Sequence, residues 1–132
     1  MISSAGETRA ERYVPQSLAE LKAASRGSWN WLWHGYLASG NVTLLTSLWK
    51  AGKSTLISVL LARMKTGGTV AGLPVGAGRA VVVSEEPPEK WVERSRLVDL
   101  DGHVDWFCLP FAGTPTKKAW RELLGRVVRL HE

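Results

Sequence analysis

Three short runs of apolar and β-branched residues, each bounded by turn-forming residues, predict the strands of a sheet. They cover residues 42–46, 80–84 and 104–109, and Pro110 stops the last of them. The first two runs are almost continuously apolar, which is typical of strands that are buried on both faces of a parallel sheet. We therefore expect an α/β fold with a mainly parallel sheet.

Capping signals and helical periodicity predict four helices. The four segments are 17 to about 24, 56–64, 88 to about 97, and a last helix capped by Thr114 or Thr116. The first of them carries a capping-box pattern, with Ser17 at the N-cap and Glu20 three residues later. Gly67 and Gly68 end the second helix, and the glycine-rich stretch that follows predicts a small hairpin around residues 73–75.

The loop between the run at 42–46 and the helix at 56–64 carries a phosphate-binding pattern. This loop and the helix start comprise Ser47, Leu48, Trp49, Lys50, Ala51, Gly52, Lys53, Ser54 and Thr55. In a strand–loop–helix unit of this kind, backbone N–H groups and the helix dipole point at an anion. Lys53 would reach the β- and γ-phosphates, and the Ser54 hydroxyl would bind Mg²⁺. The alternative is an ordinary Gly-Lys-Ser turn, and the flanking strand and helix patterns argue against it.

Ser47 stands where the usual pattern G-x-x-x-x-G-K-[ST] has its first glycine. That glycine often has backbone angles that are unfavourable for a residue with a side chain. We expect Ser47 either to tolerate these angles or to shift the loop slightly. Gly52, which lies closest to the phosphates in such loops, is present.

Two carboxylates, Glu85 and Glu86, come directly after the strand at 80–84. Ligands of open α/β sheets bind outside the carboxyl ends of the strands, so this pair is placed for chemistry. A carboxylate there can activate the water that attacks the γ-phosphate, or hold the Mg²⁺ shell through water. The alternative is a solvated acidic pair ahead of the helix that Pro88 begins. Because the pair follows the phosphate loop in the next core strand, we favour the functional interpretation.

Composition and charge add few constraints. The chain has 132 residues, enough for one domain, and its 45% hydrophobic and 22% charged residues are ordinary for a soluble globular protein. The net charge of +5 permits contact with nucleic acid without arguing for it, because the basic residues are scattered. No apolar run approaches the length of a membrane span. The single cysteine, Cys108, cannot form an internal disulfide, so a reducing, cytoplasmic setting is the simplest expectation.

Seven tryptophans is a high count for this length, and we expect most of them to be packing residues. Trp29, Trp31 and Trp33 alternate along the chain, as in a half-buried extended segment. Aromatic residues near a nucleotide loop could instead stack on adenine, but packing is the commoner use and we favour it.

Several of these segments carry a family resemblance. They are residues 31–32, 35–37, 42–45, 50–55, 72–75 and 78–86. Together they resemble the RecA-like branch of P-loop ATPases, and more narrowly the AAA-family ATPases similar to plasmid replicative helicases of RepA type, with kinship to DnaB-type helicases and KaiC-type ATPases. The resemblance implies a three-layer P-loop core, ATP and Mg²⁺ as cofactors, and a strand-end glutamate as catalytic base. That role falls to Glu85 first, with Glu86 as the neighbour that could substitute and Lys53 as the catalytic lysine.

The resemblance also implies a later strand that ends in an aspartate, the Walker B residue, and the chain stops before it. We therefore expect an incomplete core, with a flexible leader and short helix over 1–28 and the N-terminal part of a RecA-like ATPase domain over 29–132. An exposed sheet edge would make such a chain marginally soluble or self-associating.

The leading hypothesis is ATP binding and, in the complete protein, ATP hydrolysis that could serve DNA replication or recombination. The resemblance implies a homo-oligomeric ring; it leaves nucleic acid open as a partner, and we expect no membrane contact. The runner-up is a non-catalytic or degenerate nucleotide-binding interaction module. A third reading, a P-loop kinase, would need an acceptor site and an arginine-rich lid, and the sequence shows neither clearly.

Overall fold

The computed structural model describes residues 13–25 and 27–130. Its elements are α1 (Leu18–Ala24), β1 (Trp31–Trp33), β2 (Leu37–Ala38), α2 (Lys53–Met64), β3 (Gly68–Val70), β4 (Leu73–Val75), β5 (Ala80–Ser84), α3 (Pro88–Ser95), β6 (Val104–Cys108) and α4 (Lys117–Arg129). The four predicted helices are confirmed. Of the leader expected over 1–28, residues 1–12 and 26 lie outside the described residues.

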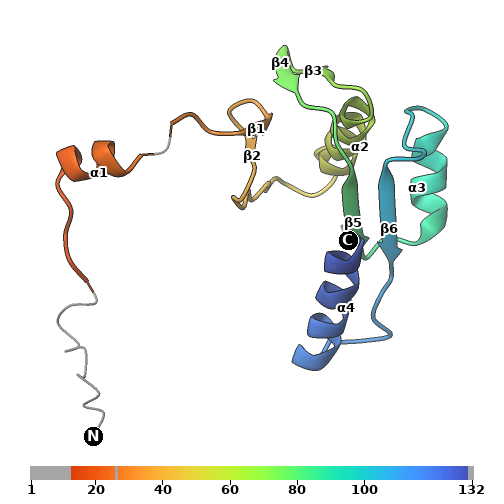
Figure 1. Ribbon diagram of the computed structural model, residues 1–132. Helices are drawn as coiled ribbons and strands as arrows, with labels where there is room; N and C mark the ends of the chain where they lie inside the picture. The colour runs from red at the N-terminus through yellow and green to blue at the C-terminus, as the bar shows by residue number, and fades with distance from the viewer. Residues whose placement is uncertain (1–12, 26, 131–132) are drawn as a thin grey trace, which may run out of the picture.

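Two helix starts follow from local capping. The Ser17 side chain accepts from the Glu20 backbone N–H while the Glu20 carboxylate accepts from the Ser17 backbone, so the predicted capping box is present. Thr116, one of the two residues expected to cap α4, accepts from the Ala119 N–H. Helix α1 has no buried residue and is set apart from the other elements in Figure 1. None of the four helices in the described part of the chain has the length and apolar character needed to cross a bilayer.

The strands form two separate sheets (Figure 1). Strands β5 and β6 pair in parallel, from Ala80 opposite Val104 to Ser84 opposite Cys108. The predicted hairpin around residues 73–75 is confirmed as β3 and β4, which belong to an antiparallel sheet with the order β2-β1-β4-β3. The fold therefore combines helices with an antiparallel sheet and a small parallel one.

The strand predicted over 42–46 is wrong. No strand covers this segment in the structure, and Val42 and Leu44 are 97% and 85% exposed. Apolar composition favours burial, but a strand also needs a neighbour for its backbone N–H and C=O groups, and none of the described strands pairs with this segment. The parallel sheet therefore has two strands instead of the three expected, and most of the strand pairing is antiparallel.

Helix α2 joins two hydrophobic clusters. Its Leu60 packs with Trp33, Val70 and Val75 of the antiparallel sheet. The neighbouring residue, Leu61, packs with a second cluster, made of Trp91, Leu100 and Val104. Trp33 is 9% exposed in this cluster, which confirms a packing role for it, and its indole Nε1 donates a hydrogen bond to the Val70 carbonyl at 3.2 Å. Helix α2 is thus packed against both hydrophobic clusters.

His103 attaches the turn before β6 to helix α2. Its ring is 6% exposed, and Nε2 lies 2.7 Å from the Leu61 carbonyl oxygen while Nδ1 lies 3.2 Å from the carbonyl of Asp101. Replacing His103 with leucine leaves the Leu61 carbonyl without this donor, and we expect the free energy of unfolding to fall by about 1–3 kcal/mol. Urea unfolding measures the change, and His103→Gln, which can still donate, should lose less. Equal losses in both variants would contradict the hydrogen-bond argument.

Candidate functional site

The loop over 47–52 leads directly into helix α2. The helix begins at Lys53 with Gly52 as N-cap, three residues before the periodic segment 56–64 and within the predicted loop and helix start. Gly52 has a φ of 90°, a left-handed conformation that favours glycine over residues with a side chain. The first N–H groups of a helix have no partner within the helix, so they are free to bind an anion at this end.

The ammonium group of Lys53 is enclosed by the loop. Its Nζ donates to the Ser47 carbonyl at 3.2 Å, the Ser47 Oγ at 2.9 Å and the Leu48 carbonyl at 3.2 Å. Three uncharged oxygens satisfy the three donors of an ammonium group and leave its positive charge uncompensated. Phosphate oxygens would therefore be better partners than these loop oxygens.

Ser47 replaces the first glycine of the pattern without backbone strain. It is not among the residues with positive φ, whereas Lys50, three positions later, has a φ of 58°. The Ser47 side chain instead contributes one of the oxygens that contact Lys53. We expected Ser47 either to tolerate unfavourable backbone angles or to shift the loop. In this loop conformation Ser47 has no positive φ, so it has no such strain to tolerate.

The loop borders a hollow of about 360 Å³. Its lining consists of Trp49, Lys50, Ala51, Gly52, Lys53, Ser54, Thr55 and Glu86. The other predicted carboxylate, Glu85, lines a different hollow, together with Phe111 and Trp120. The structure therefore brings Glu86 to the phosphate loop and places Glu85 on another surface. Trp49 is 86% exposed at the rim, where the Lys50 ammonium lies 4.4 Å from the centre of its ring.

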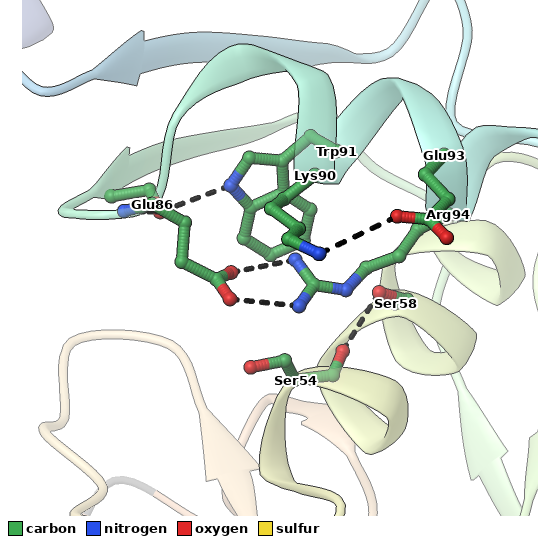
Figure 2. Close-up of polar contacts among 8 residues, drawn as sticks. Ser54, Ser58, Glu86, Lys90, Trp91, Glu93 and Arg94 are labelled. Atoms are coloured by element: carbon green, nitrogen blue, oxygen red, sulfur yellow. Dashed lines mark hydrogen bonds and ion pairs between the residues drawn. The ribbon is translucent and has the colours of Figure 1, made fainter.

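Glu86 is held by Arg94 of helix α3. Figure 2 shows the two groups paired through both oxygens and both terminal nitrogens, at 2.6 and 2.8 Å. The hydrogen bonds from Arg94 hold the pKa of Glu86 below its ordinary value, and those to Glu86 raise the pKa of Arg94. Glu86 is therefore ionised at neutral pH.

The sequence interpretation missed Arg94 as a site residue. Its guanidinium lies over the Trp91 ring, with Cζ 4.6 Å from the ring centre. One sequence feature could have indicated Arg94 as a site residue. Trp91 and Arg94 are spaced i, i+3, which places them on one face of a helix that starts two residues after Glu86.

One comparison with known proteins identifies a family for this chain. The model of a protein family described as AAA domain matches residues 7–125, which is more than half of the chain. No match was found among the curated proteins or among the solved structures. The match includes the loop, helix α2 and both carboxylates, so the chain belongs to the AAA-domain family.

Proposed function

We propose that this chain binds Mg-ATP at the loop over 47–55 and that the complete protein hydrolyses it. Membership of the AAA-domain family supports a nucleotide-binding, ATPase-like domain. The observation that carries the proposal is the Lys53 ammonium, enclosed by loop oxygens at the start of α2, in a hollow that Glu86 also lines. A cation, free helix N–H groups and a nearby carboxylate are the parts that phosphoryl transfer needs.

Each residue has a separate role in this proposal. The loop amides and Lys53 bind the phosphates, and the Ser54 hydroxyl binds Mg²⁺, which supplies charge neutralisation of the phosphate oxygens. The position of Glu86 supports it as the residue that acts on the attacking water, ahead of Glu85, because Glu86 lines the hollow beside the loop.

The finer assignment rests on the segment resemblance. We propose a three-layer RecA-like core, of which β5, β6 and α2 are parts, with a homo-oligomeric ring and a role in DNA replication or recombination for the complete protein. The parallel pairing of β5 and β6, with acidic residues directly after β5, supports this arrangement. A small sheet that leaves apolar side chains exposed, such as Val83 at 42%, supports contact with further protein surface.

A titration with Mg-ATP, followed by tryptophan fluorescence with phosphate release measured in parallel, tests the proposal. Trp49 lies in the loop and should report occupancy by ATP and ADP. AMP, which lacks the phosphates that Lys53 would reach, should give no saturable signal. Absence of a saturable signal with ATP would overturn the proposal.

One observation favours the runner-up, a non-catalytic binding module. Arg94 donates to both carboxylate oxygens of Glu86 and holds its pKa below the ordinary value, which makes Glu86 a weaker base toward water. Saturable ATP binding without phosphate release would support this module for the chain. Phosphate release that is lost in Glu86→Gln and kept in Glu85→Gln would instead support catalysis by Glu86.

A further inference from the structure

The ion pair between Glu86 and Arg94 is fixed at both ends by helix α3 and strand β5. The hydroxyl of Ser84 accepts hydrogen bonds from the Glu86 backbone N–H at 3.0 Å and from the Trp91 indole at 2.9 Å. The Trp91 ring, which is 7% exposed, in turn lies against the Arg94 guanidinium. The pair is therefore part of a connected network and differs from a solvated surface contact between two mobile side chains.

The charge of Glu86 is unfavourable for the proposed ligand. A carboxylate and a phosphate repel each other, and this repulsion is stronger near a protein surface than in bulk water. Glu86 lines the same hollow as Lys53 and Ser54, so an unpaired carboxylate there would oppose a polyphosphate. Arg94 cancels that charge at 2.6 Å, and its bidentate geometry also fixes the plane of the carboxylate.

The charge of Lys90 on α3 also lowers the pKa of Glu86, but the hydrogen bonds from Arg94 are the larger cause. Lys90 lies 3.7 Å from Glu93 in an exposed i, i+3 pair, as Figure 2 shows. Arg94 differs from Lys90 because its side chain is 23% exposed and is directed to Glu86 by the Trp91 ring.

We propose that Arg94 is a positioning residue, which holds the Glu86 carboxylate beside the phosphate loop in a neutral pair so that a nucleoside triphosphate can bind next to it. This inference rests on the proposed function of the loop. It assigns to a residue of α3 a contribution to nucleotide affinity that acts through Glu86.

Four variants test the inference by calorimetric titration with Mg-ATP. Arg94→Met keeps an unbranched stem against Trp91 but leaves Glu86 unpaired, and it should weaken binding by about tenfold. Glu86→Gln leaves Arg94 with an uncompensated positive charge and should tighten binding. The double variant should return to within about threefold of the wild type, because the net charge beside the loop is again that of the wild type. Lys90→Met removes the same charge from the same helix and should change little.

The outcomes separate this inference from the proposed function. If the wild type gives no saturable heat, the proposed function fails. If the wild type binds but Arg94→Met binds equally well, the inference fails. Equal losses in Arg94→Met and in the double variant would also overturn it, because Arg94 would then act on the phosphates directly or through the fold. Recovery in the double variant is a result that a purely structural role of Arg94 would not give.

Discussion

Replacing Lys53 with methionine is expected to lower the affinity for Mg-ATP by at least about 100-fold, because one charged donor would contact two phosphates and each such hydrogen bond contributes about 1.5–3 kcal/mol. The structure already places this ammonium inside the loop, with its three donors on oxygens of Ser47 and Leu48. Methionine has a similar length and no charge, so the variant removes the donor while it retains most of the side-chain volume.

Lys50→Met is the matched control, since both lysines belong to the same loop. The Lys50 ammonium lies over the Trp49 ring instead of inside the loop, so we expect its loss to change the affinity by no more than about threefold. Isothermal titration calorimetry is the suitable measurement, because Lys50→Met removes a contact to Trp49 and alters its fluorescence. Similar losses in the two variants would mean that the loop attracts ATP only by its total charge, and the specific role of Lys53 would be wrong.

The location of the loop was predictable because its conformation is set locally. A glycine at the N-cap, a lysine at the first helical position and the apolar period of α2 lie within one short stretch, and the structure has the helix start where they indicate. The capping box at Ser17 was predictable for a similar reason, since it depends on a pattern within one segment. These features need no knowledge of distant contacts.

The features that were not predictable depend on contacts between segments. Consecutive residues after a strand can point to opposite sides, so the sequence alone does not say whether Glu85 or Glu86 faces the loop. The choice follows from Arg94, which lies eight residues beyond Glu86 and is oriented by the Trp91 ring. The prediction of a strand over 42–46 was wrong for the same reason, because the apolar pattern of this segment does not indicate which strand would pair with it.

Trp33→Ala is expected to lower the free energy of unfolding by about 3–5 kcal/mol, the usual cost of deleting a large buried aromatic side chain. Trp33 is 9% exposed, packs against Leu60 of α2, and stacks on Tyr36 with the ring centres 4.5 Å apart. No large side chain in the described residues is less than 2% exposed. The other core residues therefore contribute little burial that could offset the loss of Trp33. Such a cost is a large part of the roughly 5–15 kcal/mol that holds a typical domain folded.

Trp33→Phe separates packing from hydrogen bonding. Phenylalanine keeps an aromatic ring against Tyr36 but loses the donor to the Val70 carbonyl, so we expect a loss of about 1–2 kcal/mol. Urea unfolding followed by circular dichroism measures both variants without relying on tryptophan emission. Because Trp33 and Leu60 connect the antiparallel sheet to α2, Trp33→Ala should also weaken Mg-ATP binding at the far end of that helix. An unfolding midpoint close to that of the wild type would show that the sheet does not support α2, and the loop would then depend only on the second cluster around Leu61.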